Sequence, residues 1–249
     1  TEVGQRIMRG AAEQIKRVTL ELGGKSANIV FADADLEKAA ASAPMSVFDN
    51  SGQDCCARSR ILVQRSVYDR FMELFETAVK GVVVTDPADE SAQMGPLISA
   101  GHRESVRSFI EGAAESVDVA FRGSMPSGPG WWYAPTVVIP RSTDDAVWRE
   151  EIFGPVVAVM PFDDEADAIA KANDTAYGLS GSIWTRDVRR AIRVARGVES
   201  GNLSVNSHSS VRYATPFGGF KQSGLGRELG PDALDAFTEV KNVFFATDD

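Results

Sequence analysis

Short apolar segments alternate with amphipathic, helix-like segments along the whole chain, and this alternation limits the folds available to it. Residues 27–31, 60–64 and 156–162 are apolar runs of strand length. After the second run, apolar side chains between residues 67 and 78 recur at the three- and four-residue spacing of one helix face. Strands that alternate with helices predict an α/β fold, in which a mostly parallel sheet carries helices on both faces.

The remaining segments continue the alternation. Further strands are predicted at residues 18–20, 117–121, 136–139, 182–184, 203–206 and 240–246, and further helices at 36–43, 105–115, 163–173 and 187–195. Either Asp33 or Asp35 is expected to cap the first of these helices. The last predicted strand has no helix after it, so we expect it to pair with the sheet of another subunit.

The composition excludes several classes of protein. The 249 residues contain 26 Lys and Arg against 35 Asp and Glu, and the formal charge of −9 is opposite to that of most nucleic-acid binders. No run reaches the roughly 18 apolar residues of a membrane span. The two cysteines are adjacent, a pattern typical of a reducing compartment. We therefore expect a cytoplasmic protein that binds neither nucleic acid nor membrane.

The motif NSGQDCC at residues 50–56 carries the strongest chemical signal. A cysteine at a boundary between a loop and a helix becomes a good nucleophile when backbone N–H groups lower its pKa. The alternative is that Cys55 and Cys56 are buried and act as small apolar residues. Together with His102 and His208 they match no metal-ligand spacing, so no metal site is predicted.

Glu21 lies in the motif LELGGKS at residues 20–26, between two leucines, the second of which precedes two glycines. Burial of a carboxylate among apolar side chains raises its pKa toward the range of a general base. The alternative is an ordinary edge-strand glutamate that points to water.

The motif GLGRELG at residues 224–230 imitates a dinucleotide-binding fingerprint. Its glycine spacing is one residue too long, and no βαβ unit follows it. We therefore do not predict phosphate binding at this segment.

Four motifs, in this order, resemble the aldehyde dehydrogenase superfamily. They are ELGGKS at residues 21–26, GQDC at 52–55, EIFGPV at 151–156, and PFGG followed by KQSG at 216–224. The spacing of about 34 residues between Glu21 and Cys55 and the motif YAPT at 133–136 also agree with this family. The resemblance covers essentially the whole chain.

The resemblance implies oxidation of an aldehyde to a carboxylic acid with NAD or NADP, of which NAD is favoured. Cys55 would be the nucleophile that forms a thiohemiacetal and then a thioester, and Glu21 the general base for its hydrolysis. Four residues would bind the cofactor: Glu151 at the nicotinamide ribose, Phe153 near the ring, Leu22 through its backbone, and Gly4 in the stretch near the phosphates.

The resemblance also implies a path for the aldehyde. Phe217 and the loop at residues 207–215 would line the tunnel to the nucleophile. Asp54, directly before Cys55, is similar to an acidic residue of some amino-aldehyde enzymes and would suit a cationic substrate. The alternative is that Asp54 caps a turn. His102 falls where the family often has a polar residue near the cofactor.

Relatives with these motifs are about twice as long, so we expect this chain to be the catalytic half of a longer enzyme. Residues 1–23 would be a remnant of the cofactor-binding domain, residues 24–237 the catalytic domain, and residues 238–249 an oligomerisation arm of a homodimer or homotetramer. The family places the asparagine of its oxyanion hole upstream, so little activity is expected of the isolated chain.

Two other functions remain open on the sequence alone. A non-catalytic protein that kept this scaffold would not need Glu21, Cys55 and Glu151 together. A cysteine-dependent acyl hydrolase needs the same thiol and carboxylate but no nicotinamide. Production of NADH from an aldehyde and NAD separates the dehydrogenase from both alternatives.

Overall fold

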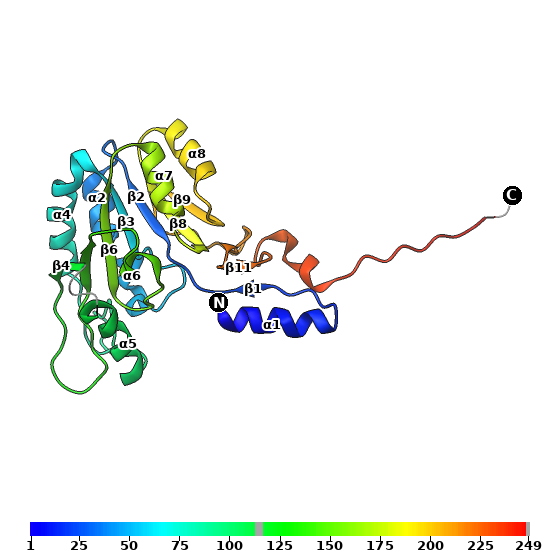
Figure 1. The fold of residues 1–249 in the computed structure, drawn as a ribbon, viewed down its shortest axis with the longest axis horizontal. Helices are drawn as coiled ribbons and strands as arrows, with labels where there is room; N and C mark the ends of the chain where they lie inside the picture. The colour runs from blue at the N-terminus through cyan, green and yellow to red at the C-terminus, as the bar shows by residue number, and fades with distance from the viewer. Residues whose placement is uncertain (113–116, 248–249) are drawn as a thin grey trace.

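A seven-stranded sheet forms the centre of the computed structural model, which describes residues 1–112 and 117–247 (Figure 1). The strand order is β4-β5-β6-β3-β2-β8-β9, and every neighbouring pair is parallel except β4 with β5. The strands are β2 (Ala27–Val30), β3 (Arg60–Gln64), β4 (Val117–Arg122), β5 (Thr136–Pro140), β6 (Val156–Phe162), β8 (Ser180–Trp184) and β9 (Asn202–Val205). The predicted α/β fold with a mostly parallel sheet is confirmed.

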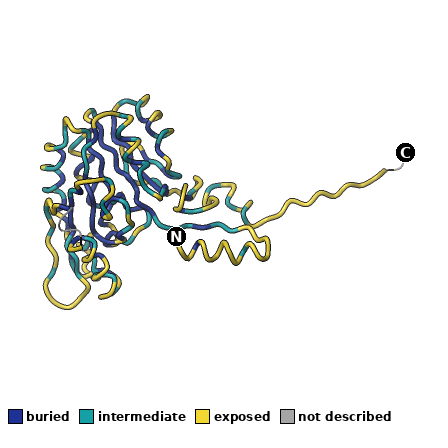
Figure 2. The backbone as a smooth tube through the Cα atoms, viewed as in Figure 1, coloured by how far each residue is buried: buried dark blue, intermediate teal, exposed yellow. Residues whose placement is uncertain are grey.

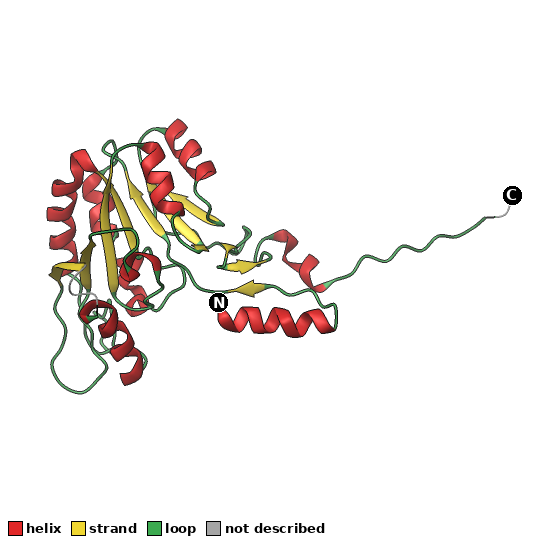
Figure 3. Cartoon of the chain, viewed as in Figure 1, coloured by secondary structure: helices red, strands yellow, loops and turns green. Residues whose placement is uncertain are grey.

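Helices cover both faces of this sheet (Figure 3). One face packs against α2 (Leu36–Ser42), α3 (Met45–Phe48) and α4 (Tyr68–Lys80), and the other against α5 (Ala100–Glu111), α6 (Ala146–Arg149), α7 (Glu165–Asn173) and α8 (Val188–Gly197). Successive residues of β3 point to opposite cores: Ile61 and Val63 to the first and Leu62 to the second. Burial of both faces explains the continuous apolar runs of the sequence.

A smaller substructure lies beside one end of the sheet (Figure 1). It contains α1 (Glu2–Glu13) and two antiparallel pairs, β1 (Leu20–Glu21) with β11 (Gly224–Leu225) and β7 (Tyr177–Gly178) with β10 (Phe220–Lys221). Short 3-10 segments occur at Asp49–Gly52, Arg65–Val67 and Pro231–Phe237. Within residues 1–112 and 117–247, no helix has the length and apolarity that a membrane crossing requires.

Several predicted boundaries shift for local reasons. Asp35 rather than Asp33 caps α2, because its side chain accepts a hydrogen bond from the Lys38 N–H. Helix α5 begins before residue 105, since the Ser99 hydroxyl accepts from the His102 N–H and caps it there. The predicted end of that helix, residues 113–115, lies outside the described residues. Strand β1 occupies residues 20–21 instead of 18–20.

The terminal strand predicted at residues 240–246 is not formed. Residues 238–247 run as an extended, exposed segment that pairs with no strand of the described chain (Figure 2). Phe244 and Phe245 are 83% and 80% exposed. A strand requires hydrogen bonds to a neighbouring strand, and this segment projects away from the sheet. Its beginning is held, because the Arg17 guanidinium donates to the Thr238 carbonyl and to the Glu239 carboxylate, both at 2.7 Å.

Two cations are buried where β2 and β3 begin. Arg60 donates hydrogen bonds to three backbone carbonyls, those of Lys25, Lys171 and Ala172, and its guanidinium stacks on the Trp148 ring. Lys25 is 1% exposed, and its Nζ has no hydrogen-bond partner among the described residues. Burial, together with the nearby Arg60 charge, lowers the pKa of Lys25 to about 7.

Replacement of Lys25 by Met should therefore stabilise the fold. The folded-state pKa lies below the ordinary value of 10.5, so the charged form costs stability below about pH 7, and this cost disappears as the pH rises toward 10.5. We expect Lys25→Met to gain about 1–3 kcal/mol near pH 6 and progressively less toward pH 10. Urea unfolding at both pH values measures this difference.

The matched control is Lys80→Met on α4, where the lysine is exposed and paired with Glu76. That variant should change the free energy of unfolding by less than about 0.5 kcal/mol at either pH. A loss of stability in Lys25→Met at pH 6 would contradict the assignment of Lys25 as a buried, unpaired charge.

Candidate active site

The turn at Gly23 and Gly24, between β1 and β2, brings two predicted site residues together. The Gly24 N–H donates a hydrogen bond to Glu151 Oε1 at 2.8 Å. A side chain at Gly24 would collide with the Cys55 carbonyl oxygen, and one at Gly23 with Glu151 Oε2. Only glycines allow the backbone to pass this close to both the cysteine loop and the Glu151 carboxylate.

The cysteine loop leads from the 3-10 segment at Asp49–Gly52 into β3, so the predicted boundary between a loop and a helix is wrong. Cys55 lies in a turn, and no helix begins after it. The turn is set up by three consecutive residues with positive φ: Asn50 at 49°, Ser51 at 60° and Gly52 at 70°. This left-handed backbone is strained for the two residues that carry a Cβ.

The two thiols differ in both access and acidity. Cys55 is half-buried, whereas Cys56 is only 7% exposed. The neighbouring Cys56 thiol and burial raise the pKa of Cys55, and the same contact, with smaller help from Arg58, lowers the pKa of Cys56. The expected lowering of the Cys55 pKa is therefore wrong for this structure, because a second thiol, instead of helix N–H groups, faces its sulfur.

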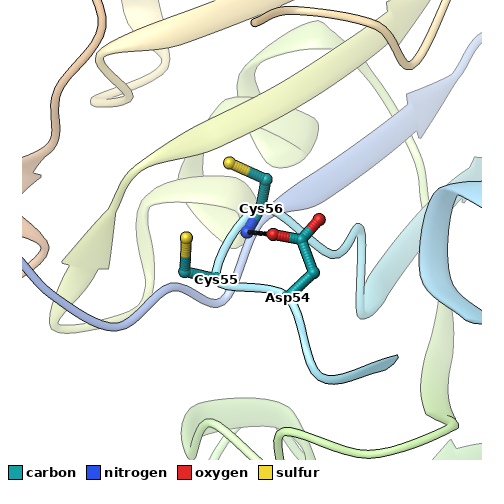
Figure 4. A group of neighbouring side chains, drawn as sticks. All are labelled: Asp54, Cys55 and Cys56. Carbon is teal, nitrogen blue, oxygen red and sulfur yellow. Dashed lines mark hydrogen bonds between the residues drawn. The ribbon is translucent and has the colours of Figure 1, made fainter. Parts of the chain in front are cut away.

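The Asp54 side chain closes the turn. Its Oδ1 accepts a hydrogen bond from the Cys56 N–H at 2.9 Å, while the two sulfur atoms lie on the other side of the loop (Figure 4). The ligand atoms of Asp54, Cys55 and Cys56 lie within 4.8 Å of one another. Of the two interpretations of Asp54, the contact at Oδ1 favours the turn cap.

Glu21 is a desolvated carboxylate, as its sequence context predicts. Neither carboxylate oxygen has a hydrogen-bond partner among the described residues. Burial and the nearby Glu228 charge raise the pKa of Glu21, and Arg227 opposes this effect. Glu21 pairs with Gly224 in β11, so the GLGRELG segment, for which no phosphate binding is predicted, lies beside the strand that carries Glu21.

Glu151 and Phe153 are held in the loop between α6 and β6. Burial raises the pKa of Glu151, against the opposing effects of the Gly24 N–H and the Lys25 charge. Phe153 has a φ of 56° and a side chain that is 40% exposed. A bulky residue in this region costs about 1–3 kcal/mol, so the surrounding structure must hold it there. His102 Nε2 lies 2.7 Å from the Phe153 carbonyl oxygen.

The other predicted site residues make two kinds of contact: Gly4 packs against the Leu22 side chain, and Phe217 pairs with Glu228 through its backbone. Gly4 is buried in α1 and lies against the Leu22 side chain. A Cβ added at Gly4 would lie only 2.7 Å from Leu22 Cδ1, so a larger residue would not fit without a shift. Phe217 exchanges two backbone hydrogen bonds of 2.7 Å with Glu228, the residue whose charge acts on Glu21. Phe217 therefore lies on the Glu21 side of the site.

Comparison with known proteins identifies the family of this chain. The sequence profile described as "Aldehyde dehydrogenase family" matches residues 1–243. The chain belongs to the aldehyde dehydrogenase family. It is 42% identical to an aldehyde dehydrogenase of Emericella nidulans, and the match covers the whole chain and half of that protein. It is 43% identical to betaine aldehyde dehydrogenase 1 of Rhizobium meliloti, and this match covers 97% of the chain and half of that protein. The chain thus spans about half the length of these curated relatives.

Solved structures of family members share the fold. An aldehyde dehydrogenase of Bacillus cereus in complex with NAD+ superposes with a TM-score of 0.91 at 42% identity, over 96% of this chain and 49% of that one. A betaine aldehyde dehydrogenase of Staphylococcus aureus in complex with NAD+ gives a TM-score of 0.89 at 40% identity, over 94% of this chain and 47% of that one.

Sequence reasoning missed Arg58 as a residue of this aldehyde dehydrogenase site. Arg58 is buried and donates to the Cys56 carbonyl at 2.5 Å, to Ser182 Oγ at 3.1 Å and to the His208 carbonyl at 2.7 Å. It ties the cysteine loop to β8 and to the loop after β9. The sequence did contain a signal for this role, since Arg58 is a charged residue between the cysteines and a buried strand. A cation that is buried at such a position needs hydrogen-bond acceptors around it.

Alkylation should distinguish the two thiols. We expect brief iodoacetamide treatment of the folded chain to label Cys55, because Cys56 is shielded. The labelling rate should increase with pH, because the pKa of Cys55 is raised and the thiolate is the reactive form. Cys56→Ser removes the neighbouring thiol and should accelerate labelling of Cys55 severalfold at neutral pH. Peptide mass spectrometry measures both. The control Cys55→Ser should label slowly, and preferential labelling of Cys56 in the unmodified chain would contradict this assignment.

Proposed function

We propose that the protein carrying this chain oxidises an aldehyde to a carboxylic acid with NAD, with Cys55 as nucleophile and Glu21 as general base. The observation that carries the proposal is the Gly23–Gly24 turn. It begins two residues after Glu21 and brings the backbone of Cys55 and the Glu151 carboxylate into contact with one short segment. Membership of the aldehyde dehydrogenase family supports the same assignment.

Each residue has a separate task in the proposed reaction. The Cys55 thiol gives up its proton to water, and the thiolate attacks the aldehyde carbon, so that an S–C bond forms and the carbonyl electrons move to oxygen. Loss of hydride from that carbon leaves a thioester on Cys55. Glu21 then takes a proton from water, whose oxygen attacks the thioester, and cleavage of the S–C bond releases the carboxylic acid and restores the thiolate. The raised pKa of Glu21 suits this task.

The residues around Glu151 fit a nicotinamide nucleotide, which accepts the hydride when bound. Glu151 offers a carboxylate to the hydroxyls of a ribose, and the exposed Phe153 ring offers an apolar surface to a flat heterocycle. Leu22 and Gly4 would border the same place from the side of α1. NAD is preferred over NADP in this proposal because the similar structures from Bacillus cereus and Staphylococcus aureus are NAD+ complexes.

The substrate class follows from the relatives. Several of them are named betaine aldehyde dehydrogenases, so a cationic amino-aldehyde is the first substrate to test. Asp54 is exposed beside Cys55, but one of its oxygens is engaged by the Cys56 N–H. Recognition of the cation would therefore use the second oxygen, with Phe217 on the far side of the tunnel.

The deciding experiment is NADH formation by the intact protein with NAD and either betaine aldehyde or an uncharged aliphatic aldehyde. We expect turnover that Cys55→Ser abolishes. Ester hydrolysis without any NAD-dependent oxidation would indicate the acyl hydrolase, and the absence of both activities would indicate a non-catalytic scaffold.

Replacement of Glu21 by Gln should slow hydrolysis more than hydride transfer, because glutamine keeps the shape but accepts no proton from water. Rapid mixing should show a burst of NADH near one equivalent per site, followed by turnover reduced at least about 100-fold. As a control, Glu76→Gln on α4 removes a carboxylate that pairs only with Lys80 among the described residues and should retain turnover. Loss of the burst together with turnover would mean that Glu21 acts earlier, for example on the Cys55 proton.

We also propose that residues 1–23 belong to the cofactor-binding domain, that residues 24–237 form the catalytic domain, and that residues 238–249 form an arm that pairs with another subunit of a homodimer or homotetramer.

Deletion of residues 238–249 should convert the intact protein to a smaller species in analytical ultracentrifugation. Arg193→Ala on α8, which removes an exposed pair with Glu165, is the control and should leave the size unchanged. An unchanged size after the deletion would contradict the proposal for the arm.

A further inference from the structure

Phe153 has the most demanding backbone of the residues around Glu151. Its φ of 56° is rare for a bulky side chain, and its ring is exposed instead of being held by a core. Its own packing therefore does not explain why it stays in this conformation. The contacts that restrain it come from the neighbouring helix α5.

His102, in the first turn of α5, is the main restraint. Its Nε2 lies 2.7 Å from the Phe153 carbonyl oxygen, so the ring donates an N–H to that oxygen. The two rings also meet edge to face, with centroids 6.2 Å apart. The histidine is fixed in turn, because the Ser99 hydroxyl accepts from the His102 backbone N–H and caps the helix.

Gly154 provides a second contact between the same loop and the same helix. A Cβ at Gly154 would lie 2.5 Å from Val106 Cγ2, so the loop rests directly on α5 one turn after His102. The Gly154 carbonyl oxygen lies in turn against Gly52 of the cysteine loop. Helix α5 is thus in contact with the loop that presents Phe153, and that loop is in contact with the loop that carries Cys55.

We propose that His102 is a positioning residue for Phe153: its Nε2–H holds the Phe153 carbonyl, and so keeps the ring turned outward where it receives the nicotinamide. This rests on the proposed function, since it assigns the exposed ring to the coenzyme. His102 acts through the Phe153 backbone and takes no part in proton transfer.

The sequence allows a direct measurement of this contact. Phe is followed by Gly at only two places, Phe153-Gly154 and Phe217-Gly218. A chain labelled with 13C at the Phe carbonyl and 15N in Gly therefore gives two carbonyl–nitrogen cross-peaks. One reports the carbonyl that His102 binds, and the other is an internal control. The measurement needs no coenzyme.

We expect His102→Leu to move the Phe153 carbonyl resonance to lower chemical shift, as for a carbonyl that loses a donor, and to leave the Phe217 peak in place. His102→Gln, which keeps an N–H donor, should restore the peak toward its original position. Arg107→Gln on the same helix is the matched control and should move neither peak, because the arginine pairs with Glu104 and Glu111 and with no other acidic residue of 1–112 and 117–247.

In the intact protein, the KM for NAD should rise about fivefold in His102→Leu, the effect of one lost hydrogen bond, with kcat nearly unchanged and His102→Gln close to the original. An unmoved Phe153 peak in a folded His102→Leu chain overturns the proposal. So does a raised KM without movement of the peak, or a moved peak with an unchanged KM. If the unaltered intact protein oxidises no aldehyde with NAD, the proposed function fails, whereas the carbonyl peak still tests the contact.

Discussion

The site depends on the glycine turn at residues 23 and 24, whose main chain approaches two other segments closely because it carries no side chains. These segments are the cysteine loop and the loop that carries Glu151. At Gly24, the N–H reaches the Glu151 carboxylate and the Cα faces the Cys55 carbonyl. Residues 127 positions apart in sequence are thereby joined by a single hydrogen bond. Any side chain at this point would separate the cysteine loop, the β1–β2 turn and the loop before β6. Their relative position is thus set by van der Waals contact of the main chain, which deforms little.

Much of this fold follows from periodicity, and the reason is burial. The bounds of β3 and β6 match the predicted strands at residues 60–64 and 156–162, because both faces of these strands are covered and their central residues are therefore apolar. Helix starts were less predictable. Asp33 and Asp35 are both good caps, and only the geometry of the chain decides that Asp35 binds the helix N–H.

The candidate site was predictable in its residue types but not in its electrostatics. The raised pKa of Glu21 follows from its apolar neighbours in sequence. The raised pKa of Cys55 does not follow from the sequence, because it depends on how the Cys56 thiol is oriented in the turn and on how far the turn is buried. The contact between His102 and Phe153 joins residues 51 positions apart. No local pattern encodes such a contact, since it arises only when α5 packs on the sheet.

The anchoring of the C-terminal segment has a geometric consequence. Arg17 binds the chain at Thr238 and Glu239, so residues 239–247 act as a tether from a known point. These nine residues span at most about 32 Å when fully extended. A sheet edge that pairs with residues 239–247 must therefore lie within that radius of the Arg17 contact. The tether thus restricts how closely and in which orientations two copies can be placed, before any side-chain contact between them is considered.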